Sequence, residues 1–224
     1  MPLNLTSNYT SWFLFAIGAY LLCSIPFGKL LSRKVAGIDI TRQGSGNVGA
    51  TNVARVIGFK WGMLTLFFDA LKGFLPVYVF LSFSSESDMG LLVVVLASLL
   101  GHQFSVFQRF RGGKGVATAL GIYLAISPGY TLIVFIFFIL TVYILDFVSL
   151  GSLLSALLMP LLLLLSGEPK MRTMTAFIMA ALIWFKHKEN IKRLFRGEEK
   201  KWKKSVTRSE DRANDPARHR NKNE

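Results

Sequence analysis

Cysteine and acidic residues are scarce in this chain of 224 residues. Its one cysteine, Cys23, lies inside an apolar run, which excludes a disulfide framework and a thiolate metal site. Lysine and arginine total 26 against 13 aspartates and glutamates, for a formal net charge of +13. Such a charge can indicate nucleic-acid binding, but residues 186–224 alone hold 14 of the basic and 7 of the acidic residues. A basic tail lying on anionic lipid explains this excess, so we expect no nucleic-acid partner.

Several familiar chemical motifs are also missing. No Gly-x-x-x-x-Gly-Lys-Ser/Thr occurs, which argues against a P-loop nucleotide site. No histidine has an aspartate five residues later, because His102 is followed by Phe107 and His187 by Lys192. His102 is expected to have no nearby carboxylate, and His219 lies in the charged tail. We therefore expect neither a metal nor a cofactor.

Long apolar runs are abundant, and they predict an all-α polytopic membrane protein. The chain is 52% apolar with a mean hydropathy of +0.44, and several runs approach the ~20 residues that a spanning helix needs. The first run lacks the basic start and small-residue cleavage pattern of a signal peptide, so it is predicted to be retained. The expected spans are 11–32, 61–83, 90–107, 116–126, 130–145, 150–165 and 173–185.

The number of crossings depends on the short runs 116–126 and 130–145. If both cross, the protein has seven transmembrane helices; if they form a hairpin that returns to the same side, it has five. Lys and Arg are rich after the first and third spans and in the tail, but absent from 1–10 and 84–89. The positive-inside rule then places the N-terminus outside and the C-terminus in the cytoplasm, which needs an odd number. We predict seven helices in a domain 1–197, followed by a charged, disordered tail 198–224.

Two polar, glycine-rich loops separate the apolar runs. The first is 44–52, Gly-Ser-Gly-Asn-Val-Gly-Ala-Thr-Asn, with Arg55 just beyond it; the second is 111–115, Arg-Gly-Gly-Lys-Gly. Glycine lets backbone N–H groups converge on an anion, and Arg55 and Lys114 add positive charge. The loops are either plain connections between spans or two halves of one phosphate site. The predicted topology favours the second interpretation, because it brings both loops to the cytoplasmic face.

The same topology brings further polar groups to that face. These are residues 187–193, whose His187, Asn190 and Arg193 recur at helical spacing, and the turn 146–152 with its serines. His187 is a candidate general base, a phosphate ligand or a simple complement to a helix C-terminus. Within the second span, Asp69 and Lys72 share a helix face, as a structural ion pair or as support for the site.

The chain resembles the acyl-phosphate:glycerol-3-phosphate acyltransferase (PlsY) family. The resemblance runs in the family's order over residues 24–199, which is nearly the whole chain except the tail. Two departures are Ser105 and Arg111, where the family usually has proline and lysine; we expect Arg111 to keep the charge and Ser105 to loosen its loop. The matching segments are 24–28, 44–52 with Arg55, 69–73, 101–102, 112–121, and 187–194 with Gly197 and Glu199.

The resemblance implies a seven-helix enzyme of the bacterial inner membrane with its site on the cytoplasmic side. It would move a fatty acyl group from acyl-phosphate to the sn-1 hydroxyl of glycerol 3-phosphate, giving lysophosphatidic acid and phosphate for phospholipid biosynthesis. Its partners would be these substrates, membrane lipid and an upstream enzyme that makes acyl-phosphate. The resemblance and the residue types together give Ser45, Lys114 and His187 as catalytic residues. Substrate-binding residues are expected to be Asn47, Thr51, Asn52, Arg55, Gly112, Gly113, Ser149, Ser152 and Asn190.

The reaction expected from these residues is direct attack by the glycerol hydroxyl, without an acyl-enzyme, because acyl-phosphate is already activated. Backbone N–H groups, Ser45 or Lys114 would stabilise the oxyanion, and either the donor phosphate or His187 would take the proton. A small-anion transporter is the main rival, weakened by polar groups at one face and the lack of an inverted repeat. A scaffolding protein is disfavoured by the glycine-presented charges.

Overall fold

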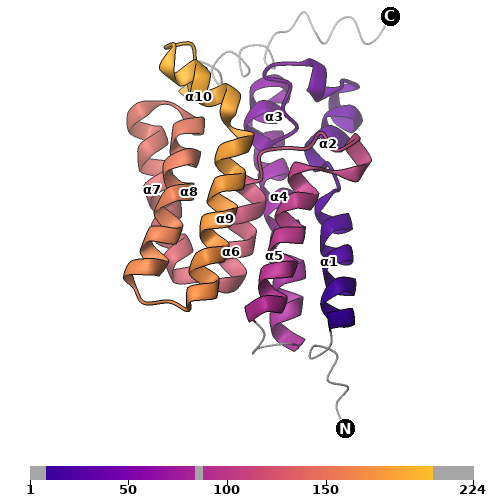
Figure 1. Cartoon of the computed structure of the whole chain (residues 1–224). Helices are drawn as coiled ribbons and strands as arrows, with labels where there is room; N and C mark the ends of the chain where they lie inside the picture. Colours follow the sequence, from indigo (N-terminus) through magenta and orange to yellow (C-terminus); the bar gives the residue numbers. More distant parts are fainter. Residues whose placement is uncertain (1–8, 84–87, 204–224) are drawn as a thin grey trace, which may run out of the picture.

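The computed structural model describes residues 9–83 and 88–203, and the described residues form helices joined by short turns (Figure 1). The acidic loop expected at 84–88 and the tail from 204 onward lie almost wholly outside these residues. The helices are α1 Tyr9–Cys23, α2 Phe27–Ala36, η1 Ile40–Arg42, α3 Ala50–Ile57, α4 Phe59–Phe83, α5 Asp88–Gln103, η2 Val106–Gln108, α6 Val116–Ile126, α7 Pro128–Leu145, α8 Val148–Leu165, α9 Lys170–Lys186 and α10 Lys188–Phe195.

The long helices stand side by side, and the short helices α2, α3 and α10 gather at one end. Figure 1 shows α2, α3 and α10 at the end of the bundle opposite the start of α1. Five segments are long and apolar enough to cross a membrane, by length and composition: 9–36, 59–83, 88–108, 128–145 and 148–165. The predicted all-helical membrane architecture is therefore confirmed, while the count of seven crossings and the orientation of the termini stay predictions.

The first predicted span is interrupted where the sequence places Pro26. α1 ends at Cys23 and α2 begins at Phe27, because Pro26 cannot continue the hydrogen-bonding pattern of α1. At this break, Gly28 packs so closely on the carbonyl oxygen of Val48 that a Cβ would collide with it. The break thus seats the 44–52 loop against α2.

α6 and α7 form the region that the sequence left ambiguous. α6 has 11 residues, about 16 Å of helix, and Figure 1 places it in the half of the bundle away from α2, α3 and α10. Only Ser127 separates α6 from α7, which begins with Pro128 in its first turn. Because α6 is short, the loop that precedes it enters the bundle instead of lying on its end.

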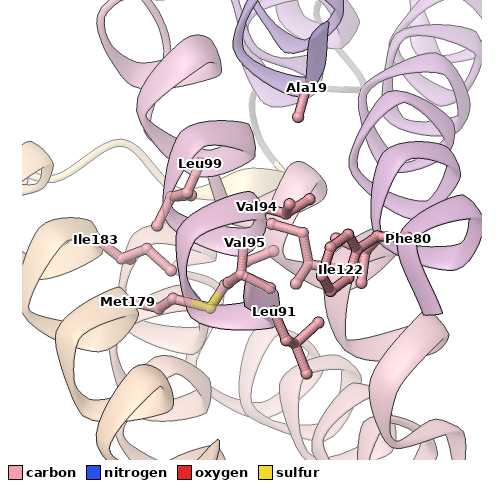
Figure 2. Close-up of a cluster of buried hydrophobic side chains, with 11 residues drawn as sticks. Ala19, Phe80, Leu91, Val94, Val95, Leu99, Ile122, Met179 and Ile183 are labelled. Atoms are coloured by element: carbon pink, nitrogen blue, oxygen red, sulfur yellow. The ribbon is translucent and has the colours of Figure 1, made fainter. Parts of the chain in front are cut away.

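The main core lies between α1, α4, α5, α6 and α9. Figure 2 shows Phe80, Ile122, Met179 and their neighbours meeting around α5, whose Val94, Val95 and Leu99 are fully buried. α4 and α6 approach closely because Gly73 and Gly121 remove side chains where each helix meets the backbone of the other. These contacts fix the elements from which the polar loops project.

Residues 198–203, which the sequence analysis assigned to the tail, pack on the helical bundle. The backbone N–H of Trp202 donates to the carbonyl oxygen of Asp146 (2.8 Å), and its ring lies 6.5 Å from that of Phe59. We call residues 198–203 the strap. The domain boundary at 197 stays a prediction, and so does the disorder predicted for 204–224, which lie outside the described residues.

Candidate active site

The 44–52 loop is shaped by the side chain of Asn52. Its amide nitrogen donates to the carbonyl oxygens of Gln43 (3.0 Å) and Asn47 (2.8 Å), and its oxygen accepts from the backbone N–H of Ser45 (2.8 Å). Gly44 has a φ of 63° and lies directly against the Asn52 amide, where a side chain would collide. The Asn52 side chain, which is only 2% exposed, therefore lies on the inner side of the loop and fixes its conformation.

The second loop is attached to the end of α5. The N–H groups of Gly112 and Gly113 donate to the carbonyl oxygens of Gln103 (3.2 Å) and His102 (3.1 Å). The Gln103 side chain donates to the carbonyl oxygen of Lys114 (2.9 Å). Gly113 lies on the edge of the His102 ring, where a Cβ would overlap Nε2. This attachment leaves the Lys114 side chain to project into the bundle.

The third group stands at the junction of α9 and α10. His187 Nδ1 lies 2.8 Å from the carbonyl oxygen of Ile183, so the neutral ring donates there and presents Nε2 as an acceptor. One turn later, Asn190 donates to Glu199 Oε1 (2.7 Å), and Arg193 donates to Glu199 Oε2 (2.7 Å). The strap carboxylate thereby joins α10 to α8, whose Ser149 also donates to Oε1 (2.8 Å).

These groups enclose one polar cavity of about 130 Å³. The cavity is lined by four cationic side chains, those of Arg55, Lys114, Arg193 and Lys200. The carboxylate of Glu199 also lines it. Asp69 also lines the cavity, but it pairs with Lys72 (2.7 Å). The cavity therefore carries more positive than negative charge, as a site for anions requires.

Burial changes the pKa values of the groups in the cavity. It lowers the pKa of Lys114 to about 8; Glu199 opposes this shift, and Arg193 and Arg55 add to it. Burial, with the charge of Lys114, lowers the pKa of His187 to about 4. Hydrogen bonds from Asn190, Ser149 and Arg193 outweigh burial and hold the pKa of Glu199 below its usual value. At neutral pH, Lys114 is mostly charged and His187 is neutral.

Two cations in the cavity have unused hydrogen-bonding capacity. Arg55 donates from a terminal nitrogen to the carbonyl oxygen of Lys200 (3.1 Å), but its Nε is buried without a hydrogen-bond partner in the described part of the chain. The Lys114 ammonium makes no hydrogen bond or ion pair with the described residues. Buried donors normally find partners, so both are positioned to bind an anion.

An apolar pocket of about 120 Å³ adjoins the polar cavity between α6, α7 and α8. Phe138 and Ser152 line both spaces, so one begins where the other ends. Phe135 lines the apolar pocket and is 37% exposed, so this wall of the pocket is also part of the outer surface of the bundle. The arrangement can bind a molecule with a charged head and a long apolar tail.

Comparison with known proteins decides the family. The family model described as glycerol-3-phosphate acyltransferase matches residues 13–197. The chain belongs to this family. It is 47% identical over 195 residues to the glycerol-3-phosphate acyltransferase of Desulfotalea psychrophila, covering 86% of this chain and 98% of that one. It is 44% identical over 189 residues to that of Lawsonia intracellularis, covering 84% and 94%.

Solved structures give the same result for the fold. A crystal structure of PlsY, an integral membrane glycerol 3-phosphate acyltransferase, in its glycerol 3-phosphate form has a TM-score of 0.81 and 43% identity, covering 85% of this chain and 95% of that one. A second, in the lysophosphatidic acid form, has a TM-score of 0.80 and 43% identity, with the same coverage. The predicted family is confirmed, and the chain is an integral membrane acyltransferase by family.

Most of the residues predicted from the sequence converge in the polar cavity. Gly112 and Gly113 do not line it; Gly112 lies in a separate groove, and Gly113 packs on His102. Asn52 reaches the cavity, but its amide is used to shape the loop. The predicted residues that line the cavity are Ser45, Asn47, Thr51, Asn52, Arg55, Lys114, Ser149, Ser152, His187 and Asn190.

Sequence reasoning underrated other residues of the cavity. Arg193, Glu199 and Lys200 line it, and the regular spacing of 187, 190 and 193 could have placed Arg193 there. The inference that His102 has no carboxylate near it is wrong, because Asp69 Oδ1 lies 3.8 Å from its Nδ1. Those residues are 33 positions apart, and only the packing of α4 on α5 brings them together.

Ser105 also corrects an expectation. We expected a serine at this position to loosen the second loop, but its buried hydroxyl donates to the carbonyl oxygen of Ser24 (2.5 Å). Ser24 in turn donates to the carbonyl oxygen of Gly101 (3.2 Å). Ser105 thus fastens the loop to the break between α1 and α2.

Proposed function

We propose that the protein transfers a fatty acyl group from acyl-phosphate to the sn-1 hydroxyl of glycerol 3-phosphate, giving lysophosphatidic acid and phosphate. The observation that carries this proposal is the cationic cavity that continues into an apolar pocket. Phosphate groups suit the first space and a fatty chain suits the second. Membership of the glycerol-3-phosphate acyltransferase family supports glycerol 3-phosphate as the acceptor.

Two of the cations that line the cavity come from separate elements, and we assign them to two clamps. Arg55 comes from α3 behind the first loop, and Lys114 comes from the second loop. Both reactants carry phosphate, and holding each one by its own clamp would align the hydroxyl with the acyl carbon. We assign Ser45, Asn47, Thr51, Ser149, Ser152, His187 and Asn190 to further contacts with the two phosphates and the reacting groups.

The proposed chemistry is a single displacement at the acyl carbon. The glycerol oxygen forms a bond to that carbon, the bond from the carbon to the phosphate oxygen breaks, and phosphate leaves. Lys114, the Ser45 hydroxyl or a loop N–H would stabilise the oxyanion that develops between these events. No acyl-enzyme is needed: Ser152 donates to the carbonyl oxygen of Val148, and Ser149 donates to Glu199, a weak base because its pKa is held below the usual value.

The donor phosphate is the better of the two candidate proton acceptors. The donor is a mixed anhydride whose phosphate gains basicity as it leaves; free phosphate is more basic than a phosphate monoester, whose second pKa of about 6 is already above the value of about 4 for His187. The proton of the hydroxyl would then leave with the phosphate. His187 Nε2 would accept a hydrogen bond from the attacking hydroxyl and orient it.

The setting proposed for this reaction is the bacterial inner membrane. Seven crossings, with α6 and α9 adding to the five longer segments, would place the polar cavity on the cytoplasmic side, as the bias of Lys and Arg requires. Glycerol 3-phosphate would arrive from the cytoplasm. The fatty chain would enter from the bilayer through the α7 side, with acyl-phosphate supplied by an upstream enzyme of phospholipid biosynthesis.

The donor is tested by incubating the purified protein with labelled glycerol 3-phosphate and either palmitoyl-phosphate or palmitoyl-CoA. We expect lysophosphatidic acid from palmitoyl-phosphate alone, and Arg55→Ala or Lys114→Ala to remove most of it. Lys170→Ala, at the other end of α9, is the matched control and should remain active. Product from palmitoyl-CoA alone would overturn the donor assignment. Uptake of glycerol 3-phosphate into proteoliposomes without any product would favour a transporter.

A further inference from the structure

A second basic groove lies on the reverse face of the two glycine-rich loops. It has a volume of about 790 Å³, and Gly46 and Val48 of the first loop and Gly112 of the second form part of its wall. The neighbouring residues Ser45, Asn47 and Lys114 face the polar cavity instead. The same two loops therefore separate the reaction cavity from another space.

The groove carries positive charge that the described residues do not neutralise. Its cations are Lys29, Arg42, Arg109 and Arg111, and its one acid is Asp39. Asp39 is shared by Lys29 (3.4 Å) and Arg33 (3.3 Å), whereas the three arginines of the groove form no ion pair within the described residues. Three unpaired guanidinium groups around one space favour a ligand with a phosphate.

The turn that carries two of these arginines is held in an unfavourable backbone conformation. Arg109 and Phe110 have φ values of 51° and 62°. These values lie in the left-handed region, which residues other than Gly and Asn rarely adopt. The turn is kept there by the N–H of Phe110, which donates to the carbonyl oxygen of Ser105 (2.8 Å), and by the bond from Ser105 to Ser24. Such strain persists where the surrounding structure imposes it, often at ligand clamps.

This turn also exposes aromatic side chains beside the charges. Phe107 and Phe110 are each 61% exposed, and Phe107 lines the groove. They follow α5 in a polar turn, beyond the apolar part of the helix. Aromatic rings and arginines side by side suit the headgroup layer of a membrane, where the rings insert and the guanidinium groups meet phosphates.

We propose that the groove binds the headgroup of an anionic phospholipid of the surrounding leaflet. Arg109 and Arg111, with Arg42 opposite, bind the phosphate, and Phe107 and Phe110 lie among the glycerol backbones and upper acyl chains. A soluble phosphate would use the arginines but would not need the exposed rings. Because the groove wall is made of the site loops, bound lipid restrains the loops that present Ser45 and Lys114.

The test measures binding of a short-chain phosphatidylglycerol to the whole protein in neutral detergent, with phosphatidylcholine of the same chain length as the reference. Native mass spectrometry counts the bound lipids. Arg109→Gln/Arg111→Gln is expected to weaken phosphatidylglycerol binding by about 30-fold, the loss expected for two charges at an anionic lipid surface. Lys34→Gln/Arg196→Gln removes two charges outside the groove, and we expect this double variant to change phosphatidylglycerol binding little. Equal losses in both double variants, or equal binding of the two lipids, would overturn the proposal.

Two further measurements separate lipid from a soluble anion and from misfolding. Phe107→Ser/Phe110→Ser keeps every charge, and we expect it to weaken phosphatidylglycerol binding as well. Displacement of the lipid by inorganic phosphate, with the phenylalanine variant binding lipid normally, would reassign the groove to soluble phosphate. An unchanged thermal unfolding temperature in each variant shows that the fold is intact. Lipid binding is measured without substrates, so its outcome does not depend on the acyl donor.

Discussion

Lys114 is the residue whose ionisation the cavity controls most directly. Its pKa of about 8 means that the ammonium form is present below that pH and is lost as the pH rises through it. The same shift makes folding less favourable where Lys114 is charged, and this penalty disappears between about pH 8 and the unfolded value near 10.4. With the phosphate-binding role proposed for Lys114, one group would connect both the activity and the stability of the protein to pH.

The first prediction follows from that pKa. For the free enzyme, kcat/KM for glycerol 3-phosphate should fall about tenfold per pH unit well above pH 8, because only the ammonium form binds phosphate. Lys114→Arg should keep some activity and lose this limb of the profile, since arginine stays charged. The measurement is a pH–rate profile from pH 6 to 10 for both proteins. A descending limb in the arginine variant at the same pH would assign the titration to another group.

Gly113 provides a second test at the residue scale. A Cβ there would overlap Nε2 of the buried His102 ring, so Gly113→Ala should shift the second loop and displace Lys114. We expect a loss of stability of about 1–3 kcal/mol, typical of an overpacked site, with a raised KM for glycerol 3-phosphate. Gly129→Ala is the control, because nothing lies within 4 Å of its added Cβ. The proposed packing is wrong if both variants have the parent KM and melting temperature.

At the scale of the elements, buried charges connect α4 to the break after α1. The Lys72 ammonium donates to the carbonyl oxygen of Ile25 (2.7 Å), pairs with Asp69 (2.7 Å) and lies 5.5 Å from the centre of the Phe27 ring. Both charged side chains are 3% exposed. The pair is therefore part of the framework that places the first loop, and Asp69 also reaches the cavity.

A charge-removal series tests that role. Lys72→Met leaves the carboxylate of Asp69 buried without its cation, which should lower stability by about 3–5 kcal/mol. Asp69→Asn/Lys72→Met removes both charges and should recover much of this loss. Thermal unfolding in detergent compares them, with Lys170→Met as a control at an exposed lysine. If the double variant is no more stable than Lys72→Met, the ion pair is not the cause.

The strap is the element that crosses the mouth of the cavity. Its Lys200 donates to the carbonyl oxygen of Gly44 (3.1 Å), and the backbone N–H of Lys203 donates to the carboxylate of Asp146 (2.8 Å). It therefore connects the first loop to the turn between α7 and α8. A segment in this position would limit the entry of water into the proposed reaction cavity.

Trp202→Ala tests the strap without touching the residues of the cavity. Loss of the contact with Phe59 should raise KM for glycerol 3-phosphate about 2- to 10-fold, in line with the 0.5–1.5 kcal/mol that an aromatic pair contributes. Hydrolysis of palmitoyl-phosphate in the absence of glycerol 3-phosphate should rise. Arg196→Ala, just before the strap, is the control. Unchanged hydrolysis together with unchanged KM would show that the strap does not close the site.

The helices and the site differ in how far the sequence predicts them. The lengths of the apolar runs and the glycine-rich segments between them predicted the positions of the main helices. Polar residues of 44–55 and 187–193 line the cavity, as expected. The contact of Asp69 with His102 and the return of Glu199 to Ser149 depend on packing between distant segments. No local pattern encodes those distances. The glycines at 112 and 113 correctly indicated close backbone contacts. These contacts are with α5, however, and Gly112 lines the groove instead of the cavity.

For the whole molecule, the remaining question is how many times the chain crosses the membrane. Five segments meet the requirements for a span by length and composition, and the shorter helices α6 and α9 would bring the count to seven. Gly129, at the start of α7, lies outside if α6 and α7 both cross, and cannot be reached from outside if they form a hairpin. Helix α10, which ends just before Arg196, lies at the opposite end of the bundle from the turn between α6 and α7 (Figure 1).

Cysteine accessibility answers this question cleanly. The native Cys23 is fully buried, so a membrane-impermeant maleimide should not modify the parent protein in intact cells. With seven crossings, Gly129→Cys should react in intact cells, whereas Arg196→Cys should react only after the membrane is opened. Failure of Gly129→Cys to react until the cells are lysed would favour five crossings. Reaction of Arg196→Cys in intact cells would reverse the orientation.

The polar cavity and the apolar pocket share a wall, and this has a consequence for the membrane itself. A product formed there keeps its chain in the bilayer and its headgroup at one end of the bundle, so it departs by lateral diffusion and never dissolves in water. New lipid is thus added to a single leaflet. Since the product enters that leaflet alone, balanced growth of the bilayer then requires lipid to move across it by a separate route.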